Sequence, residues 1–373
     1  MRQKGPFVFC SLFLLLLCEM TLIPARSQER VRTFQKLSSQ ASTTRVTQEP
    51  SDVVRVNTRV VFVDTLVKDK RTGQPIRDLA RENFQVLVDG KRRTISYFSR
   101  EGDVLRPLAL IIFLNLELPL GAIRYLERNE IQASLAAVLA RLSPEDEVAV
   151  MLIRSPAGNM PEMLTGLTRD RGKVIAALRS LSSFAQLRDD GPVAVMDEAI
   201  EQAARVATKE RPDSQTVLLY VSNGLNTLDT SDFPLRDKAA AKLIRSNIIF
   251  SALTFDMAKL AATLAPIFNQ SLRLFGASLT GSAGYFSKQT GGAEVRVHRP
   301  EDLVAGLEQI TNDLSSRYSL GFTLGENERD DGRMHKLEVK VKARDAQGKE
   351  RKLVVSSRRG YYMPKASATP AVK

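Results

Sequence analysis

The chain has 373 residues, enough for one large domain with additions or for two domains. Hydrophobic residues make up 43% of it, which excludes a chain that is disordered throughout. The formal net charge of +12 is spread along the sequence without a groove-reading motif. This pattern argues against nucleic acid as a partner and favours a solvated surface that attracts anionic envelope polymers.

Residues 1–27 have the pattern of a secretory signal peptide. Arg2 and Lys4 give a positive start, Phe7–Leu17 is apolar, and Ala25 and Ser27 are the small residues that a signal peptidase recognises. We therefore expect a secreted or periplasmic protein without a transmembrane span in its mature chain. The alternative is that the segment is retained as an N-terminal anchor, although its apolar core is short for a membrane span.

The two cysteines, Cys10 and Cys18, both lie in this segment. A mature chain without cysteine has no disulfide, no thiolate metal site and no cysteine nucleophile. We expect its stability to come from an ordinary hydrophobic core, for which the chain is large enough.

A polar stretch at 28–52 predicts a disordered linker, and 53–104 predicts a small N-terminal β module. Thr58–Val67 is rich in β-branched residues and is read as a strand. Phe84–Val88 is a second strand, closed by the Asp89-Gly90 turn signal, and Arg93–Phe98 a third.

Strands and helices then alternate over residues 105–316, which predicts an α/β domain with a mainly parallel sheet. Leu108–Leu114 is a continuous apolar run of the kind that forms a strand buried on both faces. The other expected strands are Glu147–Ile153, Thr216–Val221, Asn247–Thr254 and Glu294–Val297. The expected helices are Ile123–Leu142, Asp170–Leu181, Val193–Ala207, Phe233–Arg245, Phe255–Ser282 and Pro300–Leu314.

Residues 317–362 are predicted to be β again, with strands at Tyr318–Leu324, His335–Ala343 and Glu350–Ser357. We expect this C-terminal segment to pair with 53–104 in one sandwich-like module, because chain ends often lie close together. Residues 363–373 are expected to form a frayed tail.

The order of several short motifs resembles the von Willebrand factor A-related family of exported bacterial proteins, often acidobacterial. The motifs are VVFVDTLVKDKRTGQPI, ENFQVLVDGK, LALIIFLNLELP, SPEDEVAVMLI, TVLLYVSNGLNT, SSRYSLGF and RRGYYMP. The resemblance covers roughly residues 55–363. It implies a Rossmann-like, mainly parallel sheet with one antiparallel edge strand, wrapped by helices.

The resemblance also implies a metal-ion-dependent adhesion site, and this sequence departs from it at each matching position. Active members hold Mg²⁺ with Asp-x-Ser-x-Ser, a Thr and a second Asp, all hard oxygen ligands. The residues at these positions here are Asn115, Glu117, Pro119, Val193 and Asn223. We therefore expect a degenerate site with no bound metal and no cofactor, although Ser222 and Asn226 offer further oxygens.

The remaining candidate residues are interpreted as ordinary structural or surface residues. Glu117 as a catalytic acid needs a carboxylate partner that the sequence does not identify. His298 and His335, the only histidines, are read as surface or strand residues. Asp189-Asp190-Gly191 is read as a plain turn, and the apolar Leu260–Leu279 as a buried or amphipathic helix.

Three functions remain open on this basis. The first is a non-enzymatic, exported interaction or adhesion-type protein with an unknown protein or envelope partner. The second is cation-dependent adhesion through an altered site at Asn115, Glu117 and Asn223. The third is a cell-envelope hydrolase in which Glu117 works with a second carboxylate.

Overall fold

The computed structural model describes residues 59–100, 106–115, 128–153, 161–181, 196–222, 233–255, 283–325 and 327–363. They belong to one compact unit that spans residues 56–373. The expected signal peptide, the linker at 28–52 and residues 364–373 of the tail lie outside this part. None of the described helices is long and apolar enough to cross a membrane.

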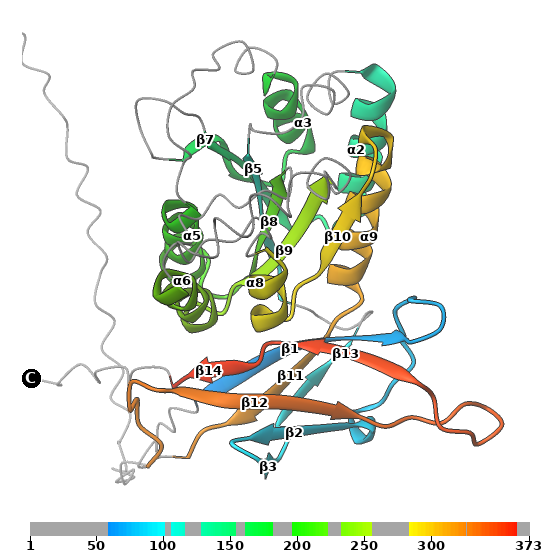
Figure 1. Cartoon of the computed structure of the whole chain (residues 1–373), viewed down its shortest axis with the longest axis vertical. Helices are drawn as coiled ribbons and strands as arrows, with labels where there is room; N and C mark the ends of the chain where they lie inside the picture. The colour runs from blue at the N-terminus through cyan, green and yellow to red at the C-terminus, as the bar shows by residue number, and fades with distance from the viewer. Residues whose placement is uncertain are drawn as a thin grey trace, which may run out of the picture. The chain divides into compact units, whose positions relative to one another are not determined.

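The central sheet has six strands in the order β10-β9-β8-β5-β6-β7 (Figure 1). Their bounds are β5 Leu108–Asn115, β6 Glu147–Ile153, β7 Glu162–Thr168, β8 Gln215–Ser222, β9 Ile249–Phe255 and β10 Glu294–Val297. All neighbours run parallel except β7, which is antiparallel to β6 at one edge. The structure thus confirms the expected α/β class with a mainly parallel sheet.

Strand β5 lies between β6 and β8 near the middle of this sheet. Its side chains alternate between the two faces, so Leu110 and Ile112 join one hydrophobic cluster while Ile111 and Phe113 join the other. All four are at most 4% exposed. A strand buried on both faces requires the continuous apolar run that the sequence shows.

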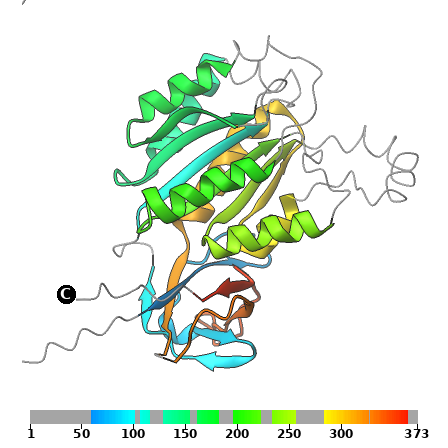
Figure 2. The same cartoon turned by 90° about the vertical axis from the view of Figure 1, so that its left-hand side faces the viewer.

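Helices of the described part of the chain cover both faces of the sheet (Figure 2). One face packs against α2 Asn129–Ala140, α3 Arg171–Arg179 and α9 Leu303–Ser315, and the other against α5 Met196–Arg205, α6 Phe233–Arg245 and α8 Ala283–Thr290. Short turns extend two of them, η2 Val206–Glu210 after α5 and η3 Pro300–Asp302 before α9. Asp170 caps α3 by accepting a hydrogen bond from the backbone N–H of Gly172 at 2.9 Å.

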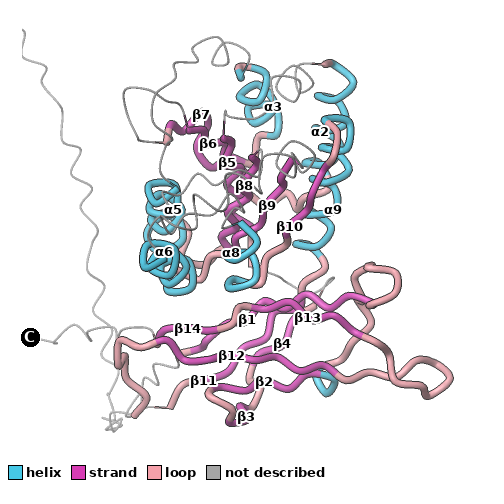
Figure 3. Tube along the Cα trace, in the orientation of Figure 1, coloured by secondary structure: helices cyan, strands magenta, loops and turns pink. Residues whose placement is uncertain are grey.

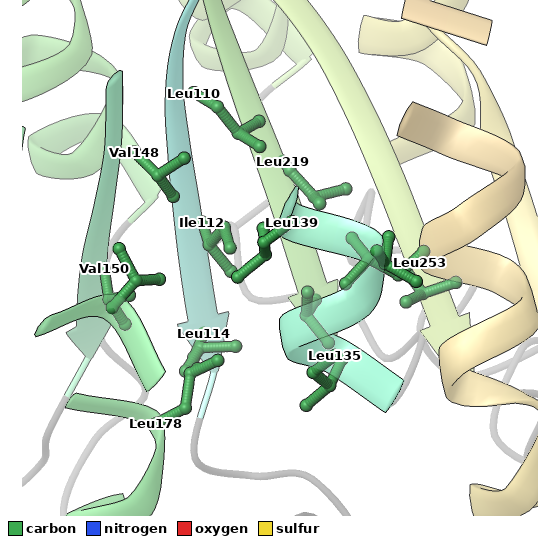
Figure 4. Packing of buried hydrophobic residues seen from close by; sticks show 14 of the residues in the cluster. Leu110, Ile112, Leu114, Leu135, Leu139, Val148, Val150, Leu178, Leu219 and Leu253 are labelled. Carbon is green, nitrogen blue, oxygen red and sulfur yellow. The ribbon is translucent and has the colours of Figure 1, made fainter. Parts of the chain in front are cut away.

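Leu139 of α2 shows how these layers interlock. It is fully buried and lies against Ile112 of β5 and near Leu219 of β8 (Figure 4). Leu178 of α3 approaches the end of the same strand at Leu114. Burial of each such leucine contributes about 2 kcal/mol to folding, so this face alone accounts for a large share of the hydrophobic stabilisation.

The remaining strands form two four-stranded sheets, β13-β1-β11-β4 and β14-β12-β2-β3 (Figure 3). Their bounds are β1 Val60–Asp69, β2 Phe84–Val88, β3 Lys91–Arg93, β4 Tyr97–Ser99, β11 Tyr318–Thr323, β12 Met334–Val341, β13 Leu353–Ser357 and β14 Gly360–Tyr362, with a short η1 at Arg81–Asn83. In each sheet, strands from before and after the central domain pair antiparallel. We call this part the β module.

Its core lies between the two sheets and is partly aromatic. The rings of Phe84 and Tyr318 lie 4.9 Å apart, and those of Phe322 and Tyr361 lie 5.6 Å apart in an edge-to-face contact. The Tyr318 hydroxyl donates to the Ile76 carbonyl at 2.9 Å. A buried phenol therefore ties the loop after β1 to strand β11.

Several expected elements differ from the structure. Arg93–Phe98 is not one strand, because β3 ends at Arg93 and β4 begins at Tyr97 in the other sheet. Asn247 does not begin a strand, since its φ of 54° places it in a left-handed turn after α6. Phe255, expected in a helix, ends β9 opposite Val297, and the rest of the helix predicted over 255–282 lies outside the described residues.

Among the described elements, β7, α8, β14 and the short η1 were not predicted. Strand β7 reads EMLTGLT and none of its residues is fully buried, so it lacks the apolar run of a buried strand. Helix α8 reads AGYFSKQT and contains few strong helix formers. Packing against the rest of the fold, which sequence patterns do not show, stabilises both.

Candidate functional site

The carboxyl edge of the central sheet is the first place to look for a site. Strand order reverses at β5, because β6 follows on one side and β8 on the other. Ligands of such sheets bind beyond the carboxyl ends of the strands at this switch point. Asn115 ends β5 here opposite Ile153 of β6, and its neighbour Leu114 is opposite Val221 of β8.

The described polar side chains at the ends of β8 and β9 are hydroxyls, and Glu162, which begins the antiparallel β7, lies at the same edge opposite Leu152 of β6. Ser222 ends β8 and is fully buried, and the register places it opposite Thr254 of β9, which is 4% exposed. The last residues of β5, β6, β8 and β9 are Asn, Ile, Ser and Phe, so none of these four strands ends in a carboxylate. Amide and hydroxyl oxygens are weaker ligands for Mg²⁺ than the carboxylates that usually anchor it.

The other residues predicted for the degenerate metal site lie outside the described part of the chain. They are Glu117, Pro119, Val193 and Asn223, and for Asn115 the backbone alone is described. Asp189–Gly191 and Leu260–Leu279 lie outside it as well. Within the described ranges, no group of three or more His, Cys, Asp or Glu side chains is arranged to hold a metal ion.

The two histidines lie in different parts of the fold. His298 is exposed just after β10. His335 of β12 is 4% exposed and stacks on Tyr361 with ring centroids 5.4 Å apart. Its Nδ1 lies 2.8 Å from Asp89 Oδ2 and its Nε2 lies 3.2 Å from Asp331 Oδ1.

These contacts give His335 a structural role in the β module. The hydrogen bond with His335 is the main reason that the pKa of Asp89 lies below its usual value. Asp89 also opens the β2–β3 turn with a φ of 47° and accepts the backbone N–H of Lys336 at 2.9 Å. The histidine therefore holds the turn against β12, as expected for an ordinary strand histidine.

A second polar cluster lies at the opposite, amino edge of the sheet, and the sequence analysis did not single it out. Arg106, just before β5, donates from Nη2 to Asp64 Oδ2 at 2.8 Å and to Gln215 Oε1 at 2.7 Å. Ser319 donates to the other Asp64 oxygen at 2.8 Å. Asp64 belongs to β1, so this carboxylate connects the β module with the central domain.

Two further arginines are buried around Asp64. Arg317 is 6% exposed and Arg358 is 9% exposed. Burial lowers the pKa of both guanidinium groups, that of Arg358 to about 10, while Asp64 favours their charged form. Arg317 lies within SSRYSLGF and Arg358 within RRGYYMP, but neither motif indicates that its arginine is buried.

No family model matches the chain, and no curated protein matches it either. Solved structures do match at low identity. BatB from Bacteroides thetaiotaomicron, described as a conserved hypothetical protein, is 14% identical, with 56% of this chain and 97% of that chain covered and a TM-score of 0.37.

Two other matches are named as von Willebrand domains. A von Willebrand factor type A protein from Catenulispora acidiphila is 12% identical, with 81% of this chain and 74% of that chain covered and a TM-score of 0.35. The vWF domain of the pilus tip protein Mfa5 from Porphyromonas gingivalis is 10% identical, with 57% and 96% covered and a TM-score of 0.36. The strand order and the antiparallel edge strand of the present chain define a Rossmann-like, von Willebrand A-type fold.

Proposed function

We propose that this is an exported, non-enzymatic interaction or adhesion-type protein that binds a protein or envelope partner without a metal ion. Its von Willebrand A-type scaffold would present the partner surface at the carboxyl edge of the central sheet. The observation that carries the proposal is the position of Asn115. It ends β5 at the switch point, where the metal-binding pattern has its first aspartate.

The chemistry of the edge supports a site of the degenerate kind. Asn115 brings no charge, and the neighbouring strand ends add hydroxyl and apolar groups. Mg²⁺ binds in proteins through carboxylates and water, so a set in which Asn115 and Asn223 stand at both aspartate positions leaves much of its charge uncompensated. The proposal follows the resemblance to exported von Willebrand A-related bacterial proteins, including their signal peptide.

Partner binding can be tested with the mature chain immobilised and exposed to envelope proteins, once with Mg²⁺ and once with a chelator. We expect the same bound proteins in both conditions. The double variant Asn115→Arg/Glu117→Arg should lose them, because two long cationic side chains alter this edge. Glu210→Ala, an exposed change just before β8 at the opposite edge, is the matched control and should retain them.

Two outcomes would contradict the proposal. Binding that the chelator abolishes would instead favour a cation site completed by a carboxylate of the partner. Binding that survives the double variant would remove the carboxyl edge from the interaction. Export is tested separately by N-terminal sequencing of the secreted product, which should begin near Gln28 if the predicted signal peptide is cleaved.

A further inference from the structure

A cavity of about 440 Å³ lies where strands β12 and β13 separate from each other. A hairpin joins the two strands, and in it the Arg351 N–H donates to the Ala343 carbonyl at 2.9 Å. The strands then enter different sheets (Figure 1). Val339 of β12 and Val355 of β13 both line the cavity, and so does Lys288 of α8. We call this cavity the β12–β13 cleft.

Strand β13 has an unpaired edge at the cleft, because β1 is its one neighbour among the described strands of that sheet. The Lys352 carbonyl accepts the N–H of Lys70 in β13's pairing with β1, at 2.8 Å. Hydrogen-bonded and non-hydrogen-bonded pairs alternate along antiparallel strands, so Val354 bonds to β1 and Val355 does not. The N–H and C=O of Val355 therefore point away from β1.

The facing edge of β12 is open at the same place. Strand β14 pairs with β12 from Met334 to Lys336 and does not reach Val339. The Lys336 carbonyl accepts the N–H of Asp89 at 2.9 Å, and the same alternation directs the N–H and C=O of Val339 away from β2. Among the described residues, no backbone hydrogen bond joins Val339 to Val355. Unpaired groups of this kind are a template for another extended chain.

Three cationic side chains line the cleft without an ion-pair partner among the described residues. They are Lys288, Lys336 and Arg359, and all three are exposed. The acidic Glu338 also lines the cleft, but it pairs with Lys340 at 3.6 Å. A positive charge beside an open strand edge favours an acidic extended chain and disfavours a basic one.

We infer that the β12–β13 cleft binds a short, extended, acidic segment of a partner protein, which adds to β13 as a further strand. Only a polypeptide supplies the alternating N–H and C=O groups that the edge at Val355 can pair with. A polysaccharide or a lipid headgroup would contact the cations and leave the edge unpaired. The inference is independent of the proposed function, because the cleft lies beside the turn before β10, away from the carboxyl edge of the central sheet.

Fluorescence anisotropy of a labelled peptide, Glu-Val-Asp-Val-Glu, titrated with the purified chain tests the inference. In one control peptide all backbone nitrogens are methylated, and in the other lysine replaces each acidic residue. We expect the acidic peptide to bind at least about tenfold more tightly than either control, because one control loses its backbone hydrogen bonds and the other meets like charges. The inference is wrong if the acidic peptide does not bind or if either control binds equally well.

Variants of the chain separate the strand edge from the charges. Val355→Pro removes the edge N–H without removing a hydrogen bond to β1, and it should weaken binding of the acidic peptide about tenfold. Lys288→Glu/Arg359→Glu leaves the edge in place and should weaken binding by a similar factor, which keeps the test decisive if Val355→Pro does not fold. Lys173→Glu, an exposed change in α3 outside the cleft, is the matched control and should leave binding unchanged.

Two further results would overturn the inference. Binding as tight as that of the parent by the double variant, or by folded Val355→Pro, would remove the cleft from the interaction. A parent dimer that Val355→Pro converts to a monomer would assign the edge to a second copy of this chain.

Discussion

Arg106 and Asp64 form a partly buried ion pair that joins the two parts of the molecule. The Nη2 atom of Arg106 lies 2.8 Å from Asp64 Oδ2, and the two side chains are 18% and 10% exposed. The Arg106 guanidinium also lies over the Phe62 ring, 4.6 Å from its centroid. Arg106, which lies two residues before β5, is thereby fixed to Asp64 of strand β1, 42 positions earlier in the chain.

Removal of the Asp64 charge should destabilise the chain strongly. Asp64→Asn leaves Arg106 without its counter-charge and removes a carboxylate that favours the charged forms of Arg317 and Arg358. One-sided loss costs about 3–5 kcal/mol in a fully buried pair and at most about 1 kcal/mol in an exposed one, so for this partly buried pair we expect a loss of about 2–3 kcal/mol in the free energy of unfolding measured with urea. A loss below about 1 kcal/mol would show that the pair contributes little.

The control is an ion pair at the surface. Asp78 pairs with Arg351 at 2.9 Å, but its side chain is 68% exposed. Asp78→Asn should therefore change the unfolding free energy by less than about 1 kcal/mol. The contrast between the two variants separates burial from the mere presence of an ion pair.

Gly292 permits a close approach between β9 and the turn before β10, because it has no Cβ atom. A Cβ atom at this position would lie 1.9 Å from the carbonyl oxygen of Phe250, a backbone atom that cannot rotate away. We expect Gly292→Ala to cost at least about 2 kcal/mol and to lower the thermal midpoint. Gly166→Ala in β7 is the matched control, because nothing lies within 4 Å of its added carbon. Equal midpoints for the two variants would contradict the described packing.

The pair of Glu147 and Arg211 predicts a pH-dependent contribution to stability. Arg211 Nη2 lies 3.0 Å from Glu147 Oε1, and this hydrogen-bonded contact is the main reason that the pKa of Glu147 lies below its ordinary 4.5. A carboxyl whose folded pKa is depressed adds stability above its unfolded pKa and loses it as pH falls through the folded value. The contribution should thus be present at pH 7 and disappear at a pH well below 4.5.

The measurement compares the unfolding free energies of the parent and Arg211→Gln at pH 7 and at pH 3. The variant should be less stable at pH 7 by at most about 1 kcal/mol, because Arg211 is 41% exposed and solvent screens the pair. The difference should shrink at pH 3. A difference that grows on acidification would reverse the expected sign and refute the assignment.

The central strands were predictable because their sequences meet a simple requirement. In the central sheet, β6 and β10 coincide with the predicted ranges, and β5 and β8 differ by one residue at their ends. A strand covered on both faces must be apolar throughout, and LALIIFL in β5 is such a run. The Asp89-Gly90 turn was equally readable, since both residues adopt the positive φ that this dipeptide tolerates.

The cluster around Arg317 was not predictable in this way. Its contacts join residues far apart in sequence, for example Ser319 with Asp64 and Arg317 with Gly291. A single arginine among serines gives no local sign that the fold will bury it. The position of the degenerate metal site was predicted from the order of the motifs. The structure does not test it fully, because four of its five residues lie outside the described part of the chain.

Calorimetric titration of the mature chain with Mg²⁺ and Mn²⁺ tests most directly whether the carboxyl edge has lost its metal. The account predicts no saturable heat in the micromolar range, because Asn115 ends β5 where a metal site needs a carboxylate. Tight binding by the parent chain that Glu117→Ala abolishes would contradict it. Glu210→Ala, at the other edge of the sheet, would show whether such a loss is specific to the predicted site.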